Sequence, residues 1–410
     1  MGERGAWEVL RVDPVRDEMR HRAIRWPTRL LVAVAGLAAC VALASCGSDL
    51  GGGDTGSTDA TVADTEPVAG EPLTIATAVL YIDKSQGAVD GPGSTLDNFT
   101  RETGIEVKYL EEINSNESEF AKLRPELENG SSGGRDLIVA TDWMARKYYD
   151  LGYLQELDHS AMPNVDENLI PALRDPAFDP GRKFSIPYQS GMTGLIVRTD
   201  LAPDITSIND LFDPKYKGKV AMLSELRDTV PLVMKADGID PEDATKEDWL
   251  AAIDKIKSAV DSGQIRDITG NDYVDDIPRG DLVAAIGWSG DAVQMQLDNP
   301  AIEFRVPDEG CIIWSDDMVI PVGAPNPGAA YKFLNFIYDP KNAAQISGYV
   351  NYTTPVAGVK DVFEKQGSDL ADNELIFPDD KFTEGCSTQP VLEGDDATEI
   401  EEAWQQVTTG

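Results

Sequence analysis

The chain has 410 residues, with 72 acidic against 35 basic side chains and a formal net charge of −37 at pH 7. So large an acidic excess excludes a nucleic-acid binder that works by neutralising phosphates, which requires clustered lysine and arginine. Only two histidines are present, which argues against multi-histidine metal sites and most histidine-based acid–base catalysis. The length suggests two or three domains, and a hydrophobic content of 41% is enough for a buried core.

Residues 1–45 have the pattern of a secretory signal peptide. Arginines from Arg4 to Arg29 precede an apolar run, Leu30–Ala44. This run is shorter than the roughly 20 residues that a membrane span requires. The basic region before the run is unusually long, and translation could begin at Met1 or at Met19.

The apolar run ends in a string typical of bacterial lipoproteins, Leu43-Ala44-Ser45-Cys46-Gly47. In such a string the cysteine is acylated and becomes the new N-terminus. The sequence that follows is rich in Gly, Ser, Asp and Thr, so we expect a lipidated flexible tether over residues 46–71. Cys40 also fits the pattern, but no polar segment follows it. An ordinary cleaved signal peptide with an incidental cysteine is the alternative.

After the tether, strand-like and helix-like segments alternate. The strand-like runs are Leu73–Ala78, Ile105–Leu110, Asp136–Thr141, Lys219–Leu223, Leu282–Trp288 and Asp317–Pro321. The helix-like runs include Ser94–Thr103, Glu117–Glu128, Trp143–Leu151, Lys246–Asp261, Gly290–Leu297 and Gly328–Ile337. Strands that alternate with helices of this length predict βαβ units around mostly parallel sheets, and therefore an α/β fold.

Two extended segments interrupt the alternation. One runs from Ser185 to Arg198, and the other runs from Cys311 to Pro321. Long β-like segments that join two α/β units would serve as hinge strands between lobes. They could equally be two more strands of a single sheet, and the residues alone leave both interpretations open.

Motifs for catalysis and for cofactors are missing from the sequence. It contains no P-loop, no G-x-G-x-x-G after a strand and no H-E-x-x-H, so no cofactor or metal is implied. The string Gly287-Trp288-Ser289-Gly290-Asp291 approaches the G-x-S-x-G of serine hydrolases but ends in Asp. We therefore do not expect an enzyme. A cell-surface hydrolase with paired carboxylates stays open, because acids are so abundant.

An ordered set of short strings resembles the spermidine/putrescine-binding proteins of bacterial ABC importers. The strings are Phe99–Ile105, Asp136–Val139, Ser185–Tyr188, Pro214–Gly218, Trp288–Gly290, Glu309–Asp316 and Tyr352–Pro355. They follow the family's order and spacing over nearly all of the mature chain. The resemblance implies a two-lobed, type II periplasmic-binding-protein fold with crossing hinge strands and hinge-bending closure. The N-lobe would comprise residues 72–188 and 316–356, and the C-lobe residues 189–315 and 357–410.

The resemblance also implies a site for a small cationic ligand, a polyamine, in a cleft between the lobes. The matching residues are Tyr81, Thr141, Trp143, Glu225, Asp228, Trp288, Trp314, Asp316, Tyr352 and Gln389. Carboxylates would pair with ammonium groups, and aromatic faces would cover methylenes and add about 0.5–2 kcal/mol each of cation–π attraction. Asp291 is a further acid near this cleft. Without the resemblance, the acids would be interpreted as a favourable first helical turn or as solvated, and the tryptophans as core residues.

Two pairs of residues carry more specific expectations. Because neighbours on a strand face opposite sides, Asp316 should face the cleft and Asp317 the other side. Cys311 and Cys386 remain after lipidation of Cys46, and an even pair of cysteines in an exported protein predicts a disulfide.

The sequence departs from the family's pattern before Tyr81. Members often have Asn-Trp-x-x-Tyr there with an acid before the Tyr, whereas this chain has Thr77, Ala78 and Leu80 at those positions. Loss of an acid predicts a preference for putrescine over spermidine, and another small cation is the alternative ligand. The expected partners are the permease subunits of an ABC transporter. We expect a monomer that contacts the outer face of the cytoplasmic membrane only through its lipid anchor and binds no nucleic acid.

Overall fold

The computed structural model describes residues 62–79, 81–83, 93–113, 115–379, 381–390, 392 and 394–409. The predicted signal peptide, Cys46, most of the predicted tether and Leu80 lie outside the described residues. The described elements all lie within residues 57–410, which form one compact unit. Within the described residues, no helix is both long enough and apolar enough to cross a membrane.

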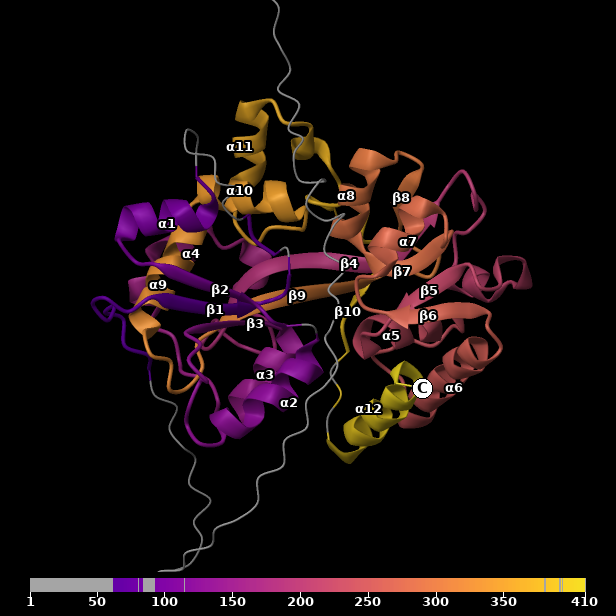
Figure 1. The fold of residues 1–410 in the computed structure, drawn as a ribbon, viewed down its shortest axis with the longest axis horizontal. Helices are drawn as coiled ribbons and strands as arrows, with labels where there is room; N and C mark the ends of the chain where they lie inside the picture. The colour runs from indigo at the N-terminus through magenta and orange to yellow at the C-terminus, as the bar shows by residue number, and fades with distance from the viewer. Residues whose placement is uncertain are drawn as a thin grey trace, which may run out of the picture. The chain divides into compact units, whose positions relative to one another are not determined.

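The described chain forms two α/β lobes that share two long strands (Figure 1). The first lobe contains β1 Leu73–Thr77, α1 Thr95–Thr103, β2 Val107–Glu111, α2 Asn116–Leu127, β3 Leu137–Thr141, α3 Asp142–Asp150, α4 Pro163–Asn168, α9 Pro327–Ile337, α10 Pro340–Val350 and α11 Val359–Gln366. The second lobe contains β5 Val220–Leu223, α5 Leu226–Ala236, α6 Lys246–Asp261, β6 Ile265–Thr269, α7 Tyr273–Arg279, β7 Ala284–Trp288, α8 Ser289–Asp298, β8 Ile302–Arg305 and α12 Gly394–Thr408. Short 3-10 helices lie at His159–Ala161, Pro171–Leu173, Ile208–Phe212, Pro214–Tyr216 and Asp369–Asp372.

Local sequence explains why the helices predicted from the sequence begin where they do. Ser94, Ser115 and Thr245 each cap the helix that follows, and their hydroxyls accept a hydrogen bond from the backbone three residues on. Such caps satisfy amide groups that have no partner inside the helix. The helix α5 begins at Leu226, so Asp228 lies in a first helical turn as expected from the sequence, and the helix continues past Pro231.

The two long strands are β4 Ile186–Arg198 and β9 Ile312–Val319, and they are the predicted hinge strands. They pair antiparallel with each other at the centre of a sheet whose order is β2-β1-β3-β9-β4-β7-β5-β6. On either side the ladders β1–β2, β1–β3, β5–β6 and β5–β7 are parallel. Both interpretations of the extended segments therefore hold, since the strands join the lobes and also continue the sheet through them.

Each lobe has its own hydrophobic core. Phe99 and Phe333 pack edge to face in the first lobe, whereas the buried Trp249 lies in the core of the second. Trp288 is half-buried and packs against both cores. The fold thus has the two-lobed α/β architecture expected from the sequence. The residue boundaries given above for the lobes stay a prediction.

A short strand near the C-terminus is attached to the hinge. Cys311 and Cys386 form a disulfide with their Cα atoms 4.3 Å apart. Directly after it, β10 Ser387–Thr388 pairs in parallel with the start of β9. The next residue, Gln389, is therefore held beside the hinge strand although it lies far away in the sequence.

Candidate functional site

The first carboxylate of the site is Asp316, on β9. It lies opposite Thr141 of β3 and Gln189 of β4 in the strand ladders, at the centre of the sheet. The hydroxyl of Tyr81 donates a hydrogen bond to Asp316 Oδ2 at 2.7 Å. Burial raises the pKa of Asp316 to about 7, and the bond from Tyr81 opposes this rise. Asp316 is therefore an ionisable group in a site from which water is largely excluded.

The neighbouring Asp317 lies on the other side of the same strand. It is fully buried, and its Oδ1 accepts a hydrogen bond from the guanidinium of Arg182 at 3.0 Å. The two acids therefore face opposite sides of β9, as the strand alternation requires. Asp317 belongs to an internal ion pair rather than to a solvated surface.

Four aromatic rings gather around Asp316. Tyr81 makes edge-to-face contacts with Tyr188 and Tyr352, with ring centroids 5.2 and 5.9 Å apart. Trp314 contacts Tyr352 at 5.0 Å. The indole Nε1 of Trp314 is buried and has no hydrogen-bond partner among the described residues. The rings line the site with apolar surface and leave one donor available.

Two glycines make this packing possible. A Cβ at Gly191 would lie 2.5 Å from Cζ2 of Trp314, and a Cβ at Gly290 would lie 2.5 Å from Cε1 of Tyr352. Real Cβ atoms do not approach other atoms this closely, so any larger residue would push the rings away. These two glycines therefore set the positions of Trp314 and Tyr352.

A second carboxylate, Asp228, comes from the first turn of α5 in the second lobe. It is 2% exposed and accepts hydrogen bonds from Nε1 of Trp288 at 3.0 Å and from Nε2 of Gln389 at 2.7 Å. Burial raises the pKa of Asp228, and these two donors oppose the rise. The structure thus brings together Asp228, Trp288 and Gln389, which lie far apart in the sequence.

The third carboxylate of the site is Asp291 of α8. The sequence indicated it only as an acid near the cleft, but the structure gives it two hydrogen-bond donors. The hydroxyl of Tyr352 donates to Asp291 Oδ1 at 3.3 Å, and the hydroxyl of Tyr273 donates to Oδ2. Burial raises the pKa of Asp291 to about 6. The only sequence signal was that Asp291 follows Trp288 closely, and nothing in the sequence predicted Tyr273 as its partner.

Glu225 and Thr141 lie at the edge of this group. Glu225 immediately precedes α5, and burial raises its pKa well above the ordinary value, with further contributions from the charges of Glu117 and Asp228. Thr141 ends β3, and its backbone amide donates to Oδ1 of Asn116. Its hydroxyl is buried without a partner in the part of the chain that the structure describes.

Trp143 does not present an open ring face on the side of the second lobe. The guanidinium of Arg227, on α5, lies over the ring with its Cζ 3.6 Å from the centroid. The same guanidinium donates to Glu401 of α12 at 2.9 Å and to Glu117 of α2 at 3.5 Å. Sequence reasoning missed this arrangement, because it depends on four helices that only the folded chain brings together.

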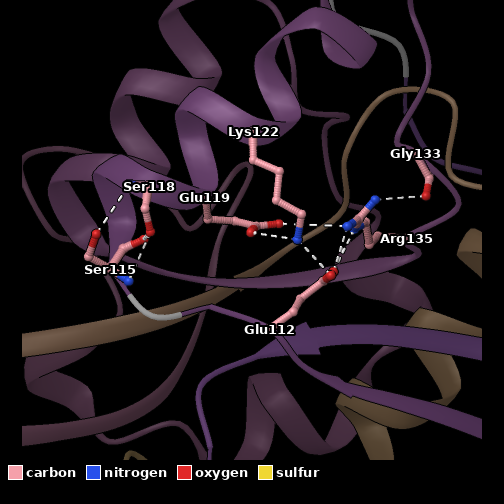
Figure 2. Close-up of polar contacts among 7 residues, drawn as sticks. All are labelled: Glu112, Ser115, Ser118, Glu119, Lys122, Gly133 and Arg135. Carbon is pink, nitrogen blue, oxygen red and sulfur yellow. Dashed lines mark hydrogen bonds and ion pairs between the residues drawn. The ribbon is translucent and has the colours of Figure 1, made fainter. Parts of the chain in front are cut away.

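A network of charges fixes the helix that carries Glu117 (Figure 2). Lys122 of α2 pairs with the buried Glu119 at 3.2 Å and with Glu112 at 2.7 Å, and Arg135 pairs with Glu112 at 2.6 Å. Burial would raise the pKa of Glu112, but the hydrogen bonds from Lys122 and Arg135 lower it below the ordinary value. This network holds α2 against the end of β2 and so positions its first turn.

A cavity of about 630 Å³ lies beside the hinge strands, and none of these three carboxylates is among its lining residues. Its lining includes Met192, Ile313 and Phe377, and Asp379 is the only acid among its described lining residues. With Lys360 also in the lining, this cavity offers a cation little net negative charge. The group of Asp228, Asp291 and Asp316 with their aromatic donors is therefore the candidate site, and it is called the carboxylate–aromatic site below.

The chemistry of this site favours a cation. Its acids accept hydrogen bonds from neutral phenol, indole and amide groups, and their pKa values are raised by burial. A cation that enters the site would stabilise the ionised carboxylates and reverse those rises. In the described residues, no group of three or more His, Cys, Asp or Glu side chains has the arrangement of a metal site.

Comparison with known proteins agrees with the fold. Residues 94–377 match the family model described as bacterial extracellular solute-binding protein. The spermidine/putrescine-binding periplasmic protein of Escherichia coli K12 is 29% identical over 292 residues, which cover 70% of this chain and 80% of the relative. The putrescine/cadaverine-binding protein of Pseudomonas aeruginosa is 28% identical over 301 residues, covering 70% and 81%.

Solved structures show the same likeness. The spermidine/putrescine ABC transporter substrate-binding protein PotD from Streptococcus pneumoniae superposes with a TM-score of 0.66 at 26% identity. The match covers 82% of this chain and 98% of that protein. With its two lobes, its crossing hinge strands and a family match over most of its length, this chain belongs to the bacterial extracellular solute-binding proteins.

Proposed function

We propose that this protein captures a polyamine in the carboxylate–aromatic site between its lobes and delivers it to an ABC permease. The observation that carries the proposal is the pairing of each of the three acids with an aromatic donor. Asp228 accepts from Trp288, Asp316 accepts from Tyr81, and Asp291 accepts from Tyr352. The names of the similar proteins, which mention spermidine, putrescine and cadaverine, support a polyamine as the ligand class.

The recognition chemistry follows from the structure of a polyamine, a chain of ammonium groups joined by methylenes. Each ammonium needs a carboxylate partner once it is removed from water, and charge-assisted hydrogen bonds are roughly twice as strong as neutral ones. The methylenes need apolar surface, which the rings of Trp288, Trp314 and Tyr352 provide. A site of this composition therefore binds cations that are both multiply charged and partly apolar.

Contributions from both lobes couple binding to closure. Tyr81 comes from the first lobe, Asp316 from the hinge strand, and Asp228 and Trp288 from the second lobe. A ligand that contacts all of them favours the closed arrangement by its differential affinity for that state. The permease would then recognise the closed, loaded protein. In this proposal the transport partner, and not a chemical reaction, consumes the bound ligand.

Export and anchoring belong to the same proposal. The arginine-rich segment and apolar run direct secretion, and acylation of Cys46 holds the protein at the outer face of the cytoplasmic membrane. Residues 62–72 pack on the first lobe, where the amide of Ala63 donates to Glu156 and that of Val68 to Asn326. The chain that leads to the anchor therefore joins the first lobe, and the monomer remains free to close around its ligand.

Within the polyamines, we propose putrescine as the preferred ligand. The sequence argument for this choice depends on Leu80, which stands where the family often has an acid. An unpaired buried ammonium costs several kcal/mol, so a triamine would be penalised at that end of the site. Another small organic cation is the second candidate within the same class of function.

A thermal-shift screen of the exported protein with putrescine, spermidine, cadaverine and a quaternary amine tests the proposal. A specific ligand at 100-fold its Kd should stabilise the fold by about 2.7 kcal/mol. The variant Asp316→Asn should lose this gain, because it removes one ionised carboxylate without changing the shape of the site. Absence of stabilisation by every amine, together with hydrolysis of a glycoside, would instead favour a hydrolase.

A further inference from the structure

We propose that Arg227 is a specificity-determining residue, which fills a cation position on Trp143 and thereby excludes the third ammonium of a triamine. This inference rests on the proposed function, because it concerns which polyamine the site accepts. It is independent of Leu80, since it uses only side chains that the structure describes.

Arg227 is held on three sides. Its side chain is 4% exposed, and the guanidinium lies flat enough over Trp143 for its Cζ to be 3.6 Å from the ring centroid. Glu401 accepts a hydrogen bond from it at 2.9 Å, and Glu117 accepts a longer one at 3.5 Å. A buried arginine with two carboxylates and an aromatic ring is fixed in one position rather than free to swing away.

The partners of Arg227 are those that recognise a ligand ammonium. An aromatic face attracts a cation within about 6 Å of its centroid, and carboxylates supply charge-assisted hydrogen bonds. In this chain an internal cation satisfies that set. A ligand ammonium could enter only by displacing a guanidinium that is covalently attached to α5 and therefore always present at high local concentration.

This internal cation adjoins the carboxylate–aromatic site. Arg227 immediately precedes Asp228 on α5, and Trp143 lies two residues after Thr141, which is the ladder partner of Asp316. A long polyamine that is anchored on Asp228 and Asp316 and extends towards Trp143 would place its next ammonium beside a like charge. A diamine ends before that point, so Arg227 should discriminate by length.

A purely structural role for Arg227 makes a different prediction. The guanidinium contacts Trp143 and Glu117 in the first lobe and Glu401 in the second, so it could act only as a bridge that stabilises closure. Loss of such a bridge would weaken the binding of every ligand by the same factor. Loss of a specificity residue changes the ratio between ligands, and this ratio distinguishes the two roles.

Calorimetric titration of the exported protein with putrescine and with spermidine measures the ratio. Arg227→Met should shift the relative affinity towards spermidine by about tenfold or more, whereas Arg227→Lys, which keeps the charge, should stay within about threefold of the parent. Arg124→Met is the matched control, because Arg124 lies on α2 and forms its ion pair with Glu128 one turn along the same helix. Arg227→Gln repeats the test with a polar neutral side chain if the Met variant does not fold.

An unchanged ratio in the neutral variants, with both ligands weakened equally, would overturn the inference and leave Arg227 as a bridge. The parent protein separates this failure from that of the proposed function. If the parent binds neither amine, the proposed function is wrong, whereas if it binds one and the ratio does not respond to Arg227, only the specificity role is wrong.

Discussion

Two groups of acids in this protein differ in what balances them. In the network of α2, Glu112 and Glu119 face Lys122 and Arg135, so negative charges meet positive ones (Figure 2). In the carboxylate–aromatic site, Asp228, Asp291 and Asp316 accept hydrogen bonds from neutral tryptophan, tyrosine and glutamine side chains. The first group is complete within the chain and serves the fold. The second group carries charge that a cationic ligand would balance, and it serves binding.

The pKa values follow the same division. Cations lower the pKa of Glu112 even though burial opposes them. Burial raises the pKa of Asp291 to about 6 and that of Asp316 to about 7, because neutral donors compensate only partly for lost hydration. Among these three acids, Glu112 with cationic partners has a lowered pKa, whereas Asp291 and Asp316 with neutral donors have raised pKa values.

The largest effect should come from the internally balanced acid Asp317. Asp317→Ala leaves Arg182 buried without its partner and should lower the free energy of unfolding by about 3–5 kcal/mol. Chemical denaturation of the ligand-free protein measures this loss. Any Asp317→Ala protein that folds should keep its ligand affinity within a few fold, since the side chain of Asp317 faces away from the site.

The adjacent acid, Asp316, should show the opposite behaviour. Asp316→Ala removes a carboxylate from the site and should weaken polyamine binding by about 2–5 kcal/mol, with little loss of stability. Calorimetry on both variants gives the comparison. Equal and small losses of affinity at the two positions would mean that the register of β9 or the location of the site is wrong.

The disulfide offers a way to change the site without touching its acids. Cys311→Ser with Cys386→Ser should reduce stability by about 2–4 kcal/mol. It should also weaken binding, because Gln389 lies three residues after Cys386 and donates to Asp228. Denaturation and calorimetry of the double variant test both effects, and Gln389→Leu in the intact disulfide background serves as the control for the site alone. A fully stable double variant would contradict the proposed role of the bridge.

Binding should depend on pH in a direction set by the raised pKa values. In the ligand-free protein Asp316 takes up a proton as the pH falls through about 7 and Asp291 as it falls through about 6, whereas a bound cation requires both ionised. Affinity should therefore weaken towards pH 5, by up to about tenfold per pH unit for each acid that must release a proton, and level off above pH 7.

The same acids should affect the stability of the ligand-free fold in the opposite direction. Because their folded pKa values exceed those of the unfolded chain, the free energy of unfolding should fall as the pH rises from about 4 to 7.

Calorimetry in buffers of different ionisation enthalpy detects the proton release directly. Affinity that is constant between about pH 5 and pH 8 would show that these acids stay ionised and would remove the distinction between the two groups.

The smallest effect should come from the network in Figure 2. Lys122→Met removes a cation that is about half exposed, and exposed ion pairs contribute only about 0–1 kcal/mol. Polyamine affinity should not change measurably in calorimetry, since Lys122 does not contact the carboxylate–aromatic site. A large loss of affinity in this variant would show that polyamine binding depends on the position of α2 and of Glu117, and would contradict the division into two groups of acids.

Much of this architecture is predictable because it depends on local pattern. The limits of Lys246–Asp261 follow from a capping threonine and helical periodicity, and the buried strand Leu137–Thr141 follows from an unbroken apolar run. The opposite orientations of Asp316 and Asp317 follow from strand geometry alone. These features depend on residues that are close in the sequence, so the sequence is sufficient to predict them.

The partners of the site residues could not be predicted in this way. The contact between Arg227 and Trp143, and the bonds of Tyr273 and Tyr352 to Asp291, join segments that lie far apart in the chain. The helix α5 carries both Arg227 and Asp228, but its local sequence does not indicate which residues these two side chains contact. Resemblance to a family indicated which residue types gather at the site, but only the folded chain shows that Trp143 already has a cation on its ring.

The most direct test of the central claim is a calorimetric titration of the exported protein with putrescine, performed on the parent and on Asp316→Asn. The account predicts saturable binding to the parent, with proton release near pH 6.5, and a loss of affinity of at least about tenfold in the variant. Binding of putrescine with equal affinity to both proteins, or no binding to the parent by putrescine or any other amine, would contradict it.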